Sequence, residues 1–232
     1  MGLAIDTTFD FLTETPPGKD ADAVSPTLKR YHRHLWTKPL PSGPVFDLQE
    51  RPGAYLTYET EGRTIYPASD AITTNLYGKA ARIIDQIPPA EIPPDLGYTI
   101  GSSIIFPGER IGRQMTINGA RGFHPQIADR FDLTLECIRR HYEGEESPLA
   151  VVLGRYGYFF DLFVDFGGYV EFFLLHDLLR GPDKVKFFME FDEFQRSSIP
   201  QDTAEYLSYR AASDDFIRAR NRRMGDFVSQ LG

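Results

Sequence analysis

The sequence is nearly free of cysteine: Cys137 is the single one among 232 residues. One cysteine excludes an intramolecular disulfide framework and a cysteine-based zinc cluster. No apolar run approaches the ~20 residues that a membrane-spanning helix needs, and the N-terminus lacks the basic stretch and apolar run of a secretory signal. We therefore expect a cytoplasmic protein that does not contact a membrane.

Basic residues are outnumbered, with 25 Lys and Arg against 33 Asp and Glu, so the formal net charge is −8. An acidic chain does not coat nucleic acid, because neutralising phosphates requires a basic face. A local basic site remains open at Arg218-Ala219-Arg220-Asn221-Arg222-Arg223. Cations are favoured near a helix C-terminus in any case, and Asp214 and Asp215 come just before. Nucleic-acid binding through this helix is thus a weak alternative.

Familiar catalytic motifs are missing as well: the chain has no H-E-x-x-H, no G-x-S-x-G and no Walker A sequence. What the chain has instead is aromatic residues, which make up 13% of it, with 18 Phe and 12 Tyr. Large rings bury much surface each, so they predict an aromatic-rich core.

The hydrophobic pattern predicts one α+β domain over residues 1–232, with a mainly antiparallel sheet from the N-terminal half packed against C-terminal helices. Strand patterns concentrate between residues 45 and 67, with a hairpin turn at Glu61-Gly62, and recur at 97–106, where 115–117 would pair. We expect helices at 27–36 with Ser25 as N-cap, 69–78, 125–142, 148–166, 169–179 and 201–224, and a further strand at 184–191.

The segment from 108 to 124 is the strongest candidate for a site. It holds four glycines and three arginines, and Glu109 is its one acid. Glycines let a backbone approach a ligand, and arginines match phosphate or carboxylate. We expect Arg110, Arg113 and Arg121 to hold an anion, with Asn118 and His124 orienting it. The alternative is that the glycines make turns and the arginines are solvated or paired.

The helix expected after this segment carries a polar stripe. At 100° per residue, one arc separate from the apolar one holds Asp129, Asp132, Glu136, Arg139 and Arg140. The stripe is either a solvated ladder of ion pairs or the wall of a cleft. In the second case Asp132 or Glu136 is the general base, Arg140 binds the ligand and His124, expected at the helix N-cap, is an acid–base group. No metal site is predicted.

Long phrases of the chain resemble a family of bacterial proteins of similar length that is known only as a domain of unknown function. They are TIGSSIIFPGERI, MTINGARGFHPQIADRFDLTLECIRRHY and FFDLFVDFGGYVEFFLLHDL, clearest at 99–142 and 159–176, and SPTLKRYHRHLWTKPLP and FIRARNRR extend the likeness over nearly the whole chain. The resemblance implies a bacterial, cytoplasmic, single-domain protein and supplies no catalytic residue, ligand or fold.

Two functional hypotheses follow. In the first, the chain binds or processes a phosphate-bearing small molecule or nucleotide at 108–124, and the arginines converge on a pocket with the acids nearby. In the second, it is a non-enzymatic protein-interaction module, in a stress or phage-defence setting. The arginines then point apart, and an exposed apolar patch exists elsewhere. Enzymatic activity, cofactors and oligomeric state do not follow from the sequence.

Overall fold

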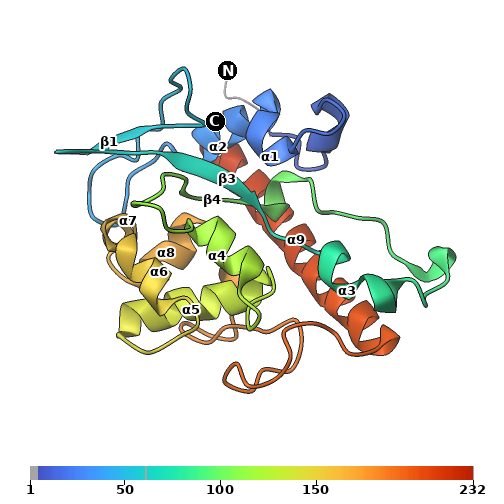
Figure 1. The fold of residues 1–232 in the computed structure, drawn as a ribbon. Coiled ribbons are helices and arrows are strands. Elements are labelled where there is room, and N and C mark those ends of the chain that lie inside the picture. Colours follow the sequence, from blue (N-terminus) through green and yellow to red (C-terminus); the bar gives the residue numbers. More distant parts are fainter. Residues whose placement is uncertain (1–4, 61, 232) are drawn as a thin grey trace.

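The computed structural model describes residues 5–60 and 62–231. It confirms the α+β class: helices surround two small antiparallel sheets of two strands each (Figure 1). Within the described residues, no helix combines the length and apolar character needed to cross a bilayer.

The N-terminal part contains the short helices η1 (Phe11–Glu14) and α1 (Ala21–Val24) and the longer α2 (Pro26–Trp36). The predicted cap of α2 is confirmed, because Ser25 Oγ accepts a hydrogen bond from the Leu28 amide at 2.9 Å. A proline at the first helical position needs no amide partner. Sequence-local chemistry therefore decides where α2 begins.

Four strands form the two sheets. The strand pairing of the predicted hairpin is confirmed, since β1 (Tyr58–Thr60) pairs antiparallel with β2 (Arg63–Ile65), while Glu61 of the predicted turn lies outside the described residues. The helix expected from residue 69 is wrong, because 67–71 form strand β3 (Pro67–Ala71), which pairs antiparallel with β4 (Ser103–Pro107). The expected pairing of 115–117 with β4 is also wrong: β3 takes that place, and Thr116 caps helix α4 (Ile117–Phe123) instead.

The helices between residues 125 and 179 are shorter than predicted. The helix expected from residue 125 begins later, as α5 (Phe131–Glu143), because Ala128 and Asp129 have left-handed backbones with φ of 48° and 68°. The single helix expected at 148–166 is divided into pieces, and the strand expected at 184–191 is wrong, with one isolated bridge between Leu179 and Val185 in its place. The remaining elements are α3 (Tyr77–Ile84), η2 (Pro89–Glu91), η3 (Ile100–Ser102), α6 (Ala150–Arg155), α7 (Gly157–Phe160), η4 (Asp161–Phe163), α8 (Phe166–Phe172) and η5 (His176–Leu178).

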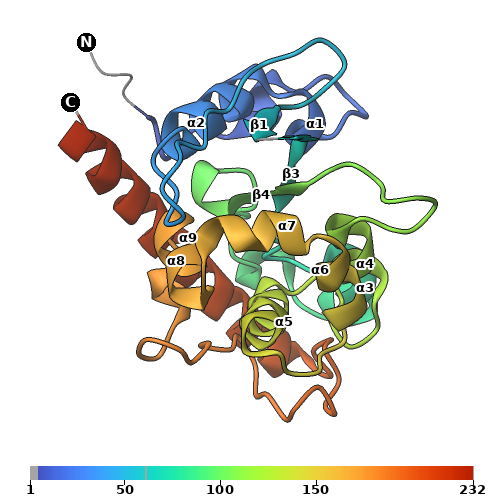
Figure 2. The same ribbon diagram turned by 90° about the vertical axis from the view of Figure 1, so that its left-hand side faces the viewer.

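The last helix, α9 (Thr203–Leu231), has 29 residues and runs diagonally along the molecule (Figure 2). Arg220 on this helix is fully buried and donates to the carbonyls of Gly101, Ser103 and Phe173 at 2.7–3.3 Å. The helix is thereby bonded both to the start of β4 and to the end of α8. The C-terminal basic run is therefore not one positive face.

An aromatic core fills the space beside α9, as predicted. Phe163, Tyr169 and Phe173 are fully buried, with ring centroids 4.9–5.3 Å apart. Trp36 joins them from α2, 5.3 Å from Phe173. The edge-to-face and tilted geometries are those that aromatic pairs prefer, and they anchor the N-terminal helix to the C-terminal ones.

Candidate functional site

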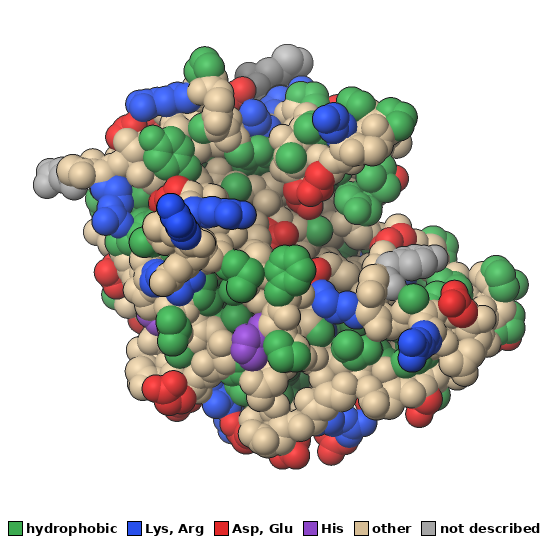
Figure 3. Space-filling view, in the orientation of Figure 1, with side chains coloured by type: hydrophobic (Ala, Val, Ile, Leu, Met, Phe, Trp, Pro, Cys, Tyr) green, Lys and Arg blue, Asp and Glu red, His purple; other side chains and the backbone are tan. Residues whose placement is uncertain are grey.

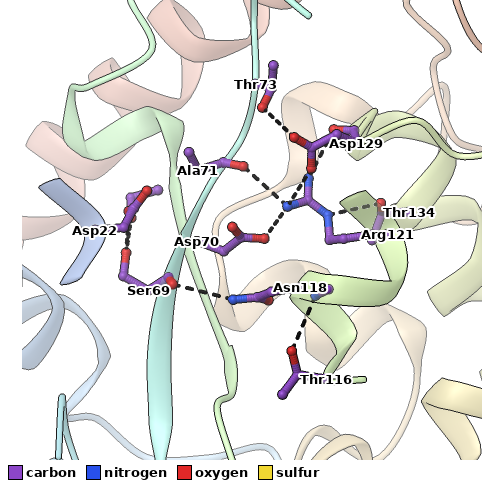
Figure 4. Close-up of polar contacts among 12 residues, drawn as sticks. Asp22, Ser69, Asp70, Ala71, Thr73, Thr116, Asn118, Arg121, Asp129 and Thr134 are labelled. Atoms are coloured by element: carbon purple, nitrogen blue, oxygen red, sulfur yellow. Dashed lines mark hydrogen bonds and ion pairs between the residues drawn. The ribbon is translucent and has the colours of Figure 1, made fainter. Parts of the chain in front are cut away.

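Arg121, the central residue of the predicted anion loop, is fully buried within the protein. From α4 it reaches β3 and the turn before α5 (Figure 4). Its guanidinium forms ion pairs with Asp70 and with Asp129 and donates to Thr134 Oγ1, the Asp129 carbonyl and the Ala71 carbonyl at 3.2–3.3 Å. Each of the three guanidinium nitrogens has a partner, so Arg121 joins three elements, and its full burial keeps it away from a ligand at the surface.

Asp132, one of the two candidate bases, is held in a buried two-point ion pair with Arg130. Its side chain is 0% exposed, and it also accepts the Phe188 amide at 2.9 Å. A carboxylate enclosed by a guanidinium and an amide has no open side for a substrate proton. The structure therefore gives Asp132 a fold-stabilising position.

Glu136, the other candidate base, is also buried, and it accepts hydrogen bonds from Arg139 at 2.9–3.0 Å and from Arg140 at 2.8 Å. Arg140 in turn contacts Glu193. The polar stripe of α5 is thus a set of ion pairs, as one hypothesis held. Its N-terminal half is buried under a later segment of the chain and is not solvated.

The other residues predicted to form the anion site lie in different places. Asn118 donates to the Ser69 carbonyl at 3.4 Å, on the β3 side of α4. Arg110 is exposed. His124 ends α4 as its C-cap, so its expected place at the N-cap of the next helix is wrong. The three arginines therefore do not converge on one point, and only Arg113 and His124 line a common hollow.

That hollow is a groove of about 600 Å³ between α4 and α6. Hydrophobic, basic and histidine side chains gather on this face (Figure 3). The exposed apolar residues are Met115, Phe123 and Val151, at 52%, 81% and 81% of their surface. The complete lining is Arg113, Gln114, Met115, Ala120, Phe123, His124, Pro125, Pro148, Leu149, Val151, Val152 and Arg155. We call it the α4–α6 groove.

The charged side chains of the α4–α6 groove are all basic: Arg113, Arg155 and, when protonated, His124. Arg155 donates from Nη2 to the Met115 carbonyl at 2.8 Å, while its Nε is buried without a partner among the described residues. His124 Nδ1 accepts the Gln126 amide at 3.3 Å, which leaves the Nε2 proton as the donor of the neutral ring. The groove therefore places basic side chains beside an apolar wall.

Sequence reasoning did not include Phe123, Val151 and Arg155 among the site residues. Val151 and Arg155 stand four residues apart on α6, so they share one face of that helix. This spacing was the one sequence feature that could have pointed to these two residues. It could not show that their face of α6 lies opposite the end of α4.

In the described ranges, no three His, Cys, Asp or Glu side chains lie close enough together to hold a metal ion. The family model described as "Family of unknown function (DUF6994)" matches residues 5–224. No curated protein and no solved structure matches the chain.

Proposed function

Because the chain belongs to this family of unknown function, whose description names no ligand, we propose from the geometry that it binds a phosphate-bearing small molecule with a planar apolar body, such as a nucleotide, in the α4–α6 groove. The observation that carries the proposal is the sign of the charge. A protein with a net charge of −8 lines this groove with arginines and with no acid.

The chemistry of such a ligand matches both halves of the groove. Guanidinium groups bind phosphate oxygens in a forked geometry, and Arg113 and Arg155 have no acidic partner within ion-pair distance among the described residues. Phe123 exposes 81% of its surface and offers a ring on which a base stacks. An apolar wall with a few polar groups is the usual make-up of small-molecule sites, and about 600 Å³ lies in their usual range.

Binding is the activity that the groove supports. Asp132 and Glu136 do not line it, so the proposal assigns them no part in catalysis.

Isothermal titration calorimetry with ATP, adenosine and inorganic phosphate tests the proposal. We expect ATP to bind most tightly, since only ATP has both the base and the phosphates. Arg113→Ala should weaken ATP binding, and Phe123→Ala should weaken both ATP and adenosine. Arg110→Ala is the matched control, because Arg110 is an exposed arginine of the same segment that does not line the groove. Equal losses for Arg110→Ala and Arg113→Ala would refute a specific site.

Protein docking is the second candidate. Met115, Phe123 and Val151 form an exposed apolar patch of the kind that partners cover. If none of the three probes binds and Phe123→Ala releases a co-purifying protein, the docking hypothesis replaces the nucleotide.

A further inference from the structure

A second pocket lies on the opposite face of β3 from Arg121. Along the strand, Ser69 points toward Asp22 of α1, whereas Asp70 points toward Arg121 (Figure 4). The pocket has a volume of about 390 Å³, and its lining shares no residue with the α4–α6 groove. The lining is Asp20, Asp22, Ala23, Lys29, Gly53, Ala54, Tyr55, Ala68 and Ser69. We call it the β3–α1 pocket.

Hydrogen bonds fix the polar wall of this pocket. Ser69 Oγ donates to Asp22 Oδ1 at 2.6 Å and lies 2.8 Å from Ser103 Oγ. The Tyr55 hydroxyl lies 3.0 Å from Nδ1 of His32, which is fully buried behind it. Burial lowers the pKa of His32 to about 3, so the ring is neutral and holds Tyr55 by a hydrogen bond alone. The polar wall of the pocket is therefore preorganised for a ligand by hydrogen bonds within the protein.

Opposite charges share the pocket without pairing. Lys29 lies over the Tyr55 ring, with Nζ 5.3 Å from the centroid. Among the described residues it forms no ion pair within 4 Å with Asp20 or Asp22. Burial, together with the nearby Asp70 and Asp20, raises the pKa of Asp22 to about 7, although Ser69 and Arg121 oppose the rise. Asp22 thus lacks a cation close enough to keep it ionised.

We propose that the β3–α1 pocket binds a small zwitterion of the α-amino acid type, with the ligand ammonium against Asp22 and the ligand carboxylate against Lys29. Each end of the ligand supplies the countercharge that its partner lacks, and charge-assisted hydrogen bonds are the stronger ones. The volume of about 390 Å³ lies within the ~300–1,000 Å³ range of small-molecule sites. The Tyr55 ring gives an apolar surface for the ligand side chain.

The arrangement also sets the pH dependence of binding. An ammonium group binds the ionised carboxylate, so the ligand and a proton compete for Asp22. The groups that face Asp22 are Asp20, Ser69, Tyr55, Lys29, Tyr98 and, across β3, Asp70 with Arg121. Arg121 stays charged throughout, and Asp70 is paired with it. Affinity is therefore governed by the titration of Asp22 near pH 7.

The test begins with a thermal-shift screen of the full chain against the free amino acids, one at a time at 1 mM, followed by calorimetry of the best binder at pH 5.5 and pH 8. With a pKa of about 7, only about 3% of Asp22 is ionised at pH 5.5. We expect binding about 30-fold tighter at pH 8. Asp22→Asn, which retains an acceptor for Ser69, should abolish both the binding and its pH dependence.

Truncated probes and a second variant separate the two ends of the ligand. Two probes are used: the amine that lacks the carboxylate of the best binder, and the carboxylic acid that lacks its ammonium group. Each should bind at least 10-fold more weakly than the best binder itself. Lys29→Met should weaken the amino acid to the level of the amine, while Lys79→Met, an exposed lysine on α3, should have no effect. The proposal would be overturned if none of the amino acids raised the melting temperature. It would also be overturned if the best binder bound more tightly at pH 5.5 than at pH 8. Phe123 lines the α4–α6 groove and not this pocket, so Phe123→Ala should leave amino-acid binding unchanged, and failures of the two sites are distinguishable.

Discussion

Replacing Asp132 by alanine is expected to be among the most destabilising single changes in this protein. The Asp132 carboxylate is 0% exposed and the Arg130 side chain is 1% exposed. Removing one partner of such a pair leaves the other charge buried and uncompensated. The Phe188 amide, 2.9 Å from Asp132 Oδ2, loses its acceptor in the same step.

The magnitude follows from these contacts. Breaking a buried ion pair by deleting one partner costs about 3–5 kcal/mol, and an unsatisfied buried amide costs about 1–3 kcal/mol. The two penalties overlap, because the cavity left by the side chain relaxes around both groups. We therefore expect the free energy of unfolding to fall by about 4 kcal/mol, a large part of the ~5–15 kcal/mol typical of a domain.

Urea unfolding followed by far-ultraviolet circular dichroism at 25 °C measures this free energy. Asp215→Ala is the matched control, because Asp215 belongs to an exposed Arg–Asp pair with Arg218 at 3.9 Å and should change stability by less than about 0.5 kcal/mol. Replacing the pair together, as Arg130→Met with Asp132→Leu, should restore much of the loss. A loss below about 1 kcal/mol for Asp132→Ala would refute the structural role and return Asp132 to the list of candidate bases.

Three further predictions concern Asp22, Gly168 and Phe123. Burial raises the pKa of Asp22 from its ordinary value of 3.8 to about 7 in the folded protein, so folding takes up a proton between these values and the free energy of unfolding falls as pH rises from about 4 to about 7. Asp22→Asn should reduce the difference between urea titrations at pH 5 and pH 8. In Gly168→Ala, the new Cβ would lie 2.1 Å from the Phe163 carbonyl oxygen, so the unfolding free energy should fall by about 1–3 kcal/mol, and an unchanged urea midpoint would contradict this. Phe123→Ala should keep stability within about 0.5 kcal/mol and weaken ATP binding about tenfold, the loss of one stacked base, so a destabilised variant would show that the ring supports the fold.

The features that sequence predicted correctly depend on neighbours in the chain. The N-terminus of α2 is set by Ser25 and the proline after it, and the hairpin of β1 and β2 is set by a turn between two short strands. The α+β class and the aromatic core follow from patterns that need no knowledge of which element touches which.

The features that sequence missed depend on distant parts of the chain. The segment 67–71 becomes a strand because fully buried β4 needs a partner for its backbone groups. The polar face of α5 was predicted to be either a solvated ladder or the wall of a cleft, but a segment more than fifty residues later covers it: the Phe188 amide contacts Asp132, and Glu193 contacts Arg140. The sequence of α5 itself therefore could not predict that this later segment buries its polar face.

The arginines show why residue type alone is a poor guide to a site. Arg121 is matched by two half-buried aspartates, Arg130 by the buried Asp132, and Arg220 by backbone carbonyls. Each of them is locked into the fold, because a buried guanidinium must have its donors filled. Arg113 and Arg155, on the same protein, have no acid within ion-pair distance among the described residues, and both line an apolar groove. Charge that the fold leaves unmatched is charge available to a ligand, and the same reasoning selects Asp22 and Lys29 in the β3–α1 pocket. Both proposed sites therefore rest on charged side chains that have no ion-pair partner in the part of the chain that the structure describes, and only the three-dimensional arrangement reveals this.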